Sequence, residues 1–223
     1  MTLYFSRLRI ARRPSTDALR RMIDPTDPNA RIDAHHKLLW SAFSDDPDRR
    51  RDFLWRAEGR GTFLTLSQRA PIGNDLFDQV DVRDFAPSLR VGDRLSFALR
   101  ANATRTKRDG GRVDVVMDAL RLVPQAERAA RRMQIAQTEA TAWLERQGAR
   151  AGFELHTTQA EEYTTLALSS HRGPRKGRPQ FGILSLSGMI EVTDPDKLLA
   201  QIGHGFGRTK AYGCGLMLIR RSL

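Results

Sequence analysis

The sequence predicts an α+β fold in which one order of elements occurs twice. In each half, short runs of β-branched and aromatic residues alternate with segments of helical spacing. A polar, basic, glycine-bearing segment at residues 103–112 separates the halves. The chain has 223 residues, 40% of them hydrophobic, which is enough for one large domain or two small ones.

The first half begins with an apolar-rich run, and the spacing of Ile32, Leu39 and Phe43 then places three apolar side chains on one face of a helix. The chain continues through strand-forming and turn-forming segments and ends in apolar/polar alternation. The predicted elements are a strand at 3–10, a helix at 32–43, strands at 53–57 and 61–68, a short helix or turn at 75–85 and a strand at 94–101.

The second half repeats this order. Valines typical of a strand follow the polar segment, and a long stretch without Gly or Pro then predicts a helix. Asp194-Pro195 opens a shorter helix, and an apolar run closes the chain. The predicted elements are a strand at 112–122, a helix at 125–147, strands at 153–169 and 181–192, a helix at 194–202 and a strand at 215–220.

Two copies of the order strand–helix–strand–strand–helix–strand match two tandem ferredoxin-like (RRM-like, βαββαβ) domains. We therefore expect an N-terminal domain over residues 1–102, which carries two adjacent histidines, and a basic linker over 103–112. The C-terminal domain over 113–223 carries a basic hairpin loop and a glycine-rich loop.

The charge of the chain indicates a polyanionic partner. There are 37 Lys and Arg residues against 26 Asp and Glu, a formal net charge of +11. Such an excess is typical of proteins that bind nucleic acid or an anionic membrane surface. No apolar run approaches the roughly 20 residues of a membrane span, so nucleic acid is the expected partner and a membrane is not.

The single cysteine, Cys214, excludes an internal disulfide framework and a cysteine-rich zinc site. Residues 1–7 lack the apolar core of a secretory signal. We expect a cytoplasmic protein.

Five glycines lie between residues 203 and 215, interleaved with basic side chains. Glycine lets a ligand approach the backbone N–H groups, so this composition suits contact with phosphate. A dinucleotide fingerprint needs a preceding strand, and a P-loop needs a Gly-Lys-[Ser/Thr] triplet; both are absent. A tight structural connection before the last strand is the alternative to an RNA-backbone contact. The residues expected to contact RNA here are Gly203, Gly205, Gly207, Arg208 and Lys210.

A second basic segment, residues 171–179, lies between two predicted strands. It could reach into a groove and neutralise phosphates, or it could be a solvated hairpin. Its candidate RNA-binding residues are Arg172, Arg175, Lys176 and Arg178.

The first helix carries His35 and His36 side by side. One or both could be partly buried and structural, or one could act as a general acid or base. Adjacent side chains on a helix point about 100° apart, which disfavours a zinc site, and no metal or cofactor site is predicted. The workable chemistry is metal-independent: the RNA 2′-hydroxyl attacks its own phosphate, leaving a 2′,3′-cyclic phosphate and a 5′-hydroxyl.

Four features occur in order along nearly the whole chain. They are the opening strand, the motif His36-x-x-Leu39-Trp40, the segment 97–102, and the ending Gly203-x-Gly205-x-Gly207-x-x-Lys210-x-x-Gly213-Cys214-Gly215-Leu216. In these features, and in Ala142-Trp143-Leu144, the chain resembles the CasE family, the CRISPR repeat-processing endoribonucleases of type I-E systems.

The resemblance implies tandem ferredoxin-like domains and metal-independent cleavage of CRISPR repeat RNA at the 3′ base of its hairpin. It also implies that the hairpin is retained and that the protein joins the other subunits of the type I-E Cascade surveillance complex. A non-catalytic RNA-binding subunit of the same fold and a basic scaffold protein are the rival hypotheses.

The resemblance selects His36 as the catalytic residue, because the family's histidine lies four residues before the tryptophan; His35 is the alternate. Lys37 is expected to contact RNA. Where family members carry a tyrosine three residues before the histidine, this chain has Asp33. The candidates to act in place of that tyrosine are Tyr212, Lys210 and Lys37.

Overall fold

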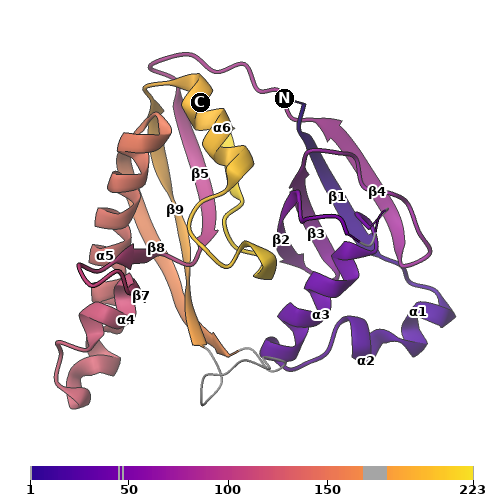
Figure 1. Cartoon of the computed structure of the whole chain (residues 1–223), viewed down its shortest axis with the longest axis horizontal. Coiled ribbons are helices and arrows are strands. Elements are labelled where there is room, and N and C mark those ends of the chain that lie inside the picture. Colours follow the sequence, from indigo (N-terminus) through magenta and orange to yellow (C-terminus); the bar gives the residue numbers. More distant parts are fainter. Residues whose placement is uncertain (1, 45, 47, 168–179, 223) are drawn as a thin grey trace. The chain divides into compact units, whose positions relative to one another are not determined.

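The protein is a mixed α/β chain with two four-stranded antiparallel sheets, seen in a computed structural model that describes residues 2–44, 46, 48–167 and 180–222 (Figure 1). The chain forms two compact units. Unit 1 comprises Met1–Pro87, Leu166–Gln180 and Lys210–Gly213, and unit 2 comprises Ser88–Thr165, Phe181–Thr209 and Cys214–Leu223. A short segment near the C-terminus therefore belongs to the unit that the N-terminal residues build.

The sheet of unit 1 has the strand order β2-β3-β1-β4. One face is filled by large side chains that are almost fully buried, among them Leu8, Trp55 and Phe63. The strands are β1 (Tyr4–Ile10), β2 (Phe53–Gly59), β3 (Thr62–Ser67) and β4 (Phe77–Asp84).

The main helix of unit 1 is α3 (Pro28–Trp40), which follows the short helices α1 (Pro14–Ala18) and α2 (Arg20–Ile23). The carboxylate of Asp27 caps α3 by accepting the N–H of Ala30 at 2.8 Å. The sequence pattern predicts the start of this helix at Ile32, four residues late, because the first turn is polar. The apolar stripe of α3 is buried, and its residues are Ile32, Leu38 and Leu39.

The sheet of unit 2 has the order β10-β5-β9-β8. The long helix α5 lies along this sheet (Figure 1) and buries Ala136, Ala140, Trp143 and Leu144. The strands are β5 (Arg94–Ala101), β8 (Phe153–Ala167), β9 (Gln180–Val192) and β10 (Met217–Arg221). The remaining elements are β6 (Thr104–Thr106), β7 (Arg112–Asp114), α4 (Val115–Leu120), the 3₁₀ turn η1 (Gln125–Glu127), α5 (Arg128–Ala151) and α6 (Pro195–His204).

The prediction of a short helix or turn at 75–85 is wrong, because these residues contain strand β4. Its aspartates favour turns locally, but its backbone pairs along the whole of β1, with Asp81 opposite Arg7. Tertiary hydrogen bonding therefore overrides the local composition. As a result β5, which the element order assigns to the first domain, pairs instead with β9 and β10 in the second sheet.

The segment 103–112 is likewise not a free linker. Thr104–Thr106 pairs with Arg112–Asp114 as a hairpin, and its turn is closed by hydrogen bonds between Lys107 and Gly111 and between Gly110 and Lys107. The strand predicted at 112–122 ends at Asp114, because its carboxylate accepts the N–H groups of Val116 and Met117 and so starts α4.

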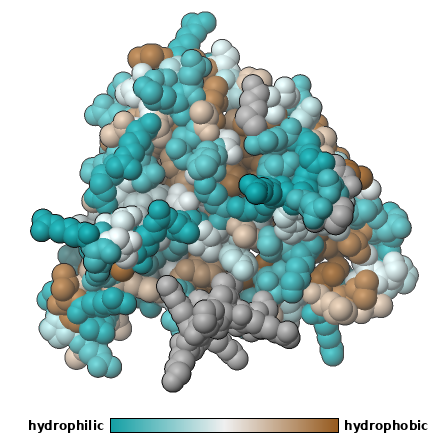
Figure 2. Space-filling view, viewed as in Figure 1, coloured by the Kyte–Doolittle hydropathy of each residue, from teal (hydrophilic) through white to brown (hydrophobic). Residues whose placement is uncertain are grey.

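Hydrophilic side chains cover most of the face shown in Figure 2, and hydrophobic ones appear in scattered patches. None of the helices in the described part of the chain has the length and hydrophobicity needed to cross a bilayer. The only cysteine, Cys214, is buried, and burial raises the pKa of its thiol to about 12.

The glycine-rich segment has a structural role in unit 2. Gly205 ends α6 with a φ of +82°, and Gly207 has a φ of +71° beside the backbone of Asn102. Asn102 is buried and holds the segment through its carbonyl, which accepts the N–H of Arg208 at 3.2 Å, and its side-chain oxygen, which accepts the hydroxyl of Thr209 at 2.8 Å.

We predict that Gly207→Ala destabilises the protein by about 2 kcal/mol or more, because a β-carbon in this left-handed conformation would lie 2.6 Å from the carbonyl oxygen of Asn102. Chemical denaturation measures the loss. The matched control is Gly73→Ala, whose β-carbon would meet nothing within 4 Å. Equal stability of the two variants would contradict the prediction.

Candidate active site

The two histidines of α3 have different surroundings. His35 is 7% exposed, and its Nε2 lies 3.0 Å from Oδ1 of Asp24. Its ring packs edge-on against Phe63, with 4.8 Å between ring centroids. Burial lowers the pKa of His35, although Asp24 opposes that effect. His35 is therefore a buried, hydrogen-bonded residue of the core. A structural histidine of this kind is one of the two alternatives that the sequence leaves open.

His36 is half-buried, and its Nε2 accepts the indole N–H of Trp40 at 3.0 Å. A histidine that accepts at Nε2 carries its proton on Nδ1 when it is neutral. Burial lowers the pKa of His36, and the cations Arg51 and Lys37 lower it further, against Asp33. Because histidine ordinarily titrates near 6.5, His36 is neutral at pH 7.

The 3₁₀ turn η2 (Lys210–Tyr212) belongs to the same unit as α3 and packs against α3 and β2. The indole N–H of Trp55 donates to the carbonyl of Ala211 at 3.0 Å. Gly213, with a φ of +75°, continues the chain over the Trp55 ring, where a β-carbon would lie 3.1 Å away. This turn brings Tyr212 beside His36, with ring centroids 5.7 Å apart and planes at 54°.

Tyr212 is a protonated phenol at neutral pH, since burial and the nearby carboxylate of Asp33 raise its pKa. Asp33 also accepts the ammonium of Lys37 at 2.8 Å, across one turn of α3. The sequence names Lys37, Lys210 and Tyr212 as possible partners of His36, and Asp33 as the residue at the expected tyrosine position. In the structure Asp33, Lys37 and Tyr212 lie close to His36.

Lys210, like Tyr212, belongs to the part of the glycine-rich segment that lies in unit 1. Its pKa is lowered by burial and by the positive charge of Arg51. Arg51 precedes β2 and is half-buried itself, which lowers its own pKa. Sequence reasoning missed Arg51, because it stands in the run Arg49-Arg50-Arg51, which looks like an ordinary solvated surface.

The other predicted RNA-binding residues lie elsewhere. Gly203, Gly205, Gly207 and Arg208 belong to unit 2, and Arg208 is exposed. Arg172, Arg175, Lys176 and Arg178 lie outside the described residues.

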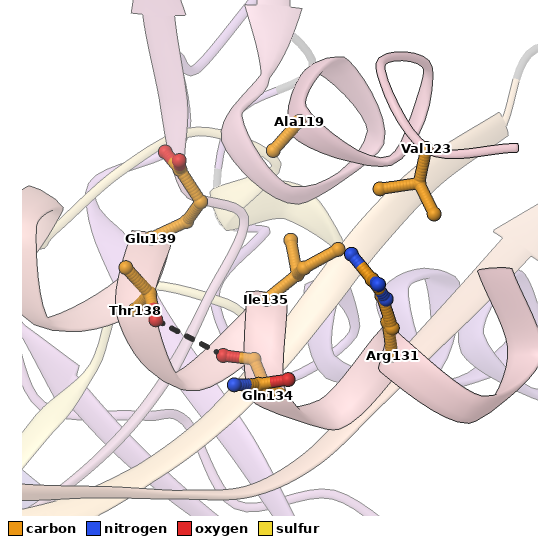
Figure 3. Close-up of a pocket in the computed structure, with 7 residues that line it drawn as sticks. All are labelled: Ala119, Val123, Arg131, Gln134, Ile135, Thr138 and Glu139. Atoms are coloured by element: carbon orange, nitrogen blue, oxygen red, sulfur yellow. Dashed lines mark hydrogen bonds between the residues drawn. The ribbon is translucent and has the colours of Figure 1, made fainter. Parts of the chain in front are cut away.

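A pocket of about 320 Å³ lies between α4 and α5 of unit 2 (Figure 3). Its polar groups are paired with neighbouring residues. The hydroxyl of Thr138 donates to the carbonyl of Gln134 at 3.2 Å, and Oε2 of Glu139 lies 3.5 Å from Nη1 of Arg105. The lining contains no histidine, cysteine or tyrosine among the described residues; it consists of Ala119, Val123, Arg131, Gln134, Ile135, Thr138 and Glu139. Within the described ranges, no three His, Cys, Asp or Glu side chains cluster closely enough to hold a metal ion.

A family model described as "CRISPR associated protein" matches residues 3–221. The chain is 25% identical over 193 residues to the Cascade subunit CasE of Escherichia coli K12, covering 82% of this chain and 88% of that protein. It is 29% identical over 146 residues to the CRISPR-associated endoribonuclease Cse3 of Thermus thermophilus, covering 61% and 60% of the two chains.

The fold matches solved structures over the same length. Thermus thermophilus Cse3, bound to an RNA representing a pre-cleavage complex, superposes with a TM-score of 0.69 at 28% identity, covering 99% of this chain and all of that one. The mixed α/β architecture with antiparallel sheets is therefore shared with an RNA-bound protein.

We predict that Trp40→Phe raises the pKa of His36 toward the ordinary value and reduces its Nδ1–H population. The indole N–H bonds only to an unprotonated Nε2, so it stabilises the neutral ring. Long-range ¹H–¹⁵N NMR over a pH titration reads both quantities, and the His35 signals serve as the internal control. An unchanged His36 titration would contradict the assigned hydrogen bond.

Proposed function

This chain belongs to the family of CRISPR-associated proteins and is homologous to CasE and Cse3, and we propose that it is a metal-independent endoribonuclease acting on CRISPR repeat RNA. The observation that carries the proposal is the cluster in unit 1, where neutral His36 lies beside the Tyr212 phenol. The charge of Arg51 lowers the pKa of both His36 and Lys210, so the cations Arg51 and Lys210 belong to the same cluster. General base, hydrogen-bond donor and cations are the groups that transesterification of RNA requires.

The reaction begins with the 2′-hydroxyl next to the scissile phosphate. Its oxygen forms a bond to phosphorus as its proton passes to His36, and the bond from phosphorus to the 5′-oxygen breaks. The 5′-oxygen takes a proton from the Tyr212 phenol, which water then reprotonates, and leaves as a hydroxyl. The other product ends in a 2′,3′-cyclic phosphate. In the free protein, Trp40 occupies the Nε2 lone pair of His36. The 2′-hydroxyl therefore takes the place of the indole N–H at this atom when RNA binds.

Tyr212 supplies the phenol in this scheme. Its raised pKa keeps the hydroxyl protonated, so that it can donate to a phosphate oxygen or to the leaving 5′-oxygen. Asp33 is an acceptor only when ionised, and it is held by Lys37. Tyr212 is consequently better suited than Asp33 to the role of the tyrosine that resemblance to CasE leads one to expect at position 33.

Both units are proposed to be ferredoxin-like domains. When the four strands of each sheet are numbered in chain order, they lie across the sheet in the order fourth, first, third, second. This is the order that a βαββαβ unit requires. Unit 1 carries α3 after its first strand but, within the described residues, no helix between β3 and β4. Unit 2 has α5 and α6 at the two expected places.

The substrate is the repeat hairpin, cut at the 3′ base of its stem, and the protein keeps this hairpin as a subunit of a type I-E Cascade complex. The names of its relatives support these assignments: one is a Cascade subunit, another a CRISPR-associated endoribonuclease. The formal charge of +11 favours RNA binding, and Lys37 and Arg208 are solvent-accessible cations available for phosphate contacts.

We predict that His36→Ala lowers single-turnover cleavage of repeat RNA by about 10²–10⁴-fold while RNA affinity changes little, because the general base is lost but the cations remain. Cleavage by the wild-type protein should persist in EDTA and yield 2′,3′-cyclic phosphate ends. His204→Ala, on the exposed end of α6, is the matched control. Strict metal dependence, or full activity of His36→Ala, would sink the proposal.

We also predict that Tyr212→Phe slows cleavage by about 10–100-fold, the range expected for one hydrogen bond to a charged group. The ring contact with His36 is retained in this variant, so thermal stability should stay near that of the wild type. Single-turnover rates and thermal melts measured together test this. A variant that melts normally and cleaves at the wild-type rate would exclude the phenol from the reaction.

A further inference from the structure

Arg51 is a half-buried cation of unit 1 with an unsatisfied donor. Its Nη1 atom is buried and has no hydrogen-bond partner among the described residues. A guanidinium presents five N–H donors, and buried donors are nearly always satisfied. An unsatisfied, immobilised guanidinium nitrogen therefore calls for an acceptor that the free protein does not supply.

The carboxylate next to Arg51 in the sequence serves another arginine. Asp52 accepts Nε of Arg69 at 2.6 Å. No carboxylate contributes to the lowered pKa of Arg51, whose cause is burial. Arg51 itself forms no ion pair with a carboxylate among the described residues of unit 1.

Arg51 lies just before β2, close enough to the candidate active site for its charge to lower the pKa of His36. Two residues later, Phe53 packs edge-on against Trp40, with ring centroids 5.4 Å apart, and Trp40 bonds to His36. The charge of Arg51 also acts on Lys210. Arg51 and Lys210 are thus two cations close enough to interact, and neither is ion-paired to a carboxylate in the described ranges. Such a pair of cations forms a site for an anion.

We propose, on the premise of the ribonuclease function above, that Arg51 binds the non-bridging oxygens of the scissile phosphate together with Lys210 and stabilises the charge of the phosphorane. As the 2′-oxygen adds to phosphorus, negative charge builds on these two oxygens. A planar guanidinium fork can hold both, and Lys210 adds a point charge. Because Nη1 is shielded from solvent in the free protein, the Arg51 side chain turns toward the bound phosphate, which then supplies the acceptor that Nη1 lacks.

The test compares Arg51→Gln with Arg50→Gln, since Arg50 is an exposed neighbour and its loss removes the same charge. Single-turnover cleavage should fall by about 10²–10³-fold in Arg51→Gln, as for loss of an oxyanion donor, and by no more than about threefold in Arg50→Gln. Affinity for a repeat RNA with a 2′-deoxy group at the cleavage site should fall less than about tenfold in both, because most phosphate contacts remain. A phosphorothioate at the scissile phosphate should slow Arg51→Gln less than it slows the wild type.

The pH profile gives a readout that loss of packing alone would not move. The charges that act on His36 are Arg51 and Lys37, which lower its pKa, and Asp33, which raises it, while the Tyr212 phenol packs beside its ring. Removing Arg51 raises the pKa of His36, so the acidic limb of the rate profile should shift to higher pH in Arg51→Gln and not in Arg50→Gln.

Arg51→Lys keeps the charge but loses the fork, and it should cleave about tenfold more slowly than the wild type even if Arg51→Gln does not fold. Wild-type rates in Arg51→Gln or in Arg51→Lys would overturn the role of Arg51 and leave the ribonuclease proposal standing. No cleavage by the wild-type protein would reject the ribonuclease proposal itself, and this role with it.

Discussion

The hydrogen bond from the Trp55 indole to the carbonyl of Ala211, at 3.0 Å, is the constraint on which the candidate site depends. Trp55 is one of the most buried side chains of unit 1, so its N–H is fixed in direction by the core. Without this bond, a three-residue 3₁₀ turn would have little to hold it against α3. With it, Tyr212 lies beside His36 and Lys210 lies near Arg51.

The same core explains why adjacent histidines have separate tasks. Successive side chains on a helix point about 100° apart, so a helix whose apolar stripe includes Leu38 and Leu39 can bury His35 while leaving His36 at the edge of that stripe. The Nε2 atom of His35 faces Asp24, whereas His36 is surrounded by more cations than carboxylates. Burial, reinforced by that imbalance, keeps His36 unprotonated, which a general base requires. The imbalance also favours the approach of a phosphate.

The elements that the sequence predicts well are those with strong internal patterns: the periodic helix α5, the alternating strand β5 and the apolar strand β1. It fails for β4 and α4, where distant pairing with β1 and a single cap at Asp114 decide the outcome. The candidate site divides in the same way. His36 stands in a local motif, but the vicinity of Tyr212 depends on folding over more than 170 residues, and the unsatisfied Nη1 of Arg51 has no signature in composition.

The replacement of an expected tyrosine by Asp33 is chemically consistent only if the phenol comes from another segment. A carboxylate at position 33 would repel a phosphate, but here Lys37 compensates it at 2.8 Å and Tyr212 lies within its field. Asp33 then acts on the phenol by keeping it protonated, and on His36 by opposing the two cations. The aspartate thus tunes the two groups proposed to move the protons, without itself needing to touch the RNA. Gly213 matters for the same reason, since its positive φ directly after η2 lets the chain turn over the Trp55 ring next to Tyr212.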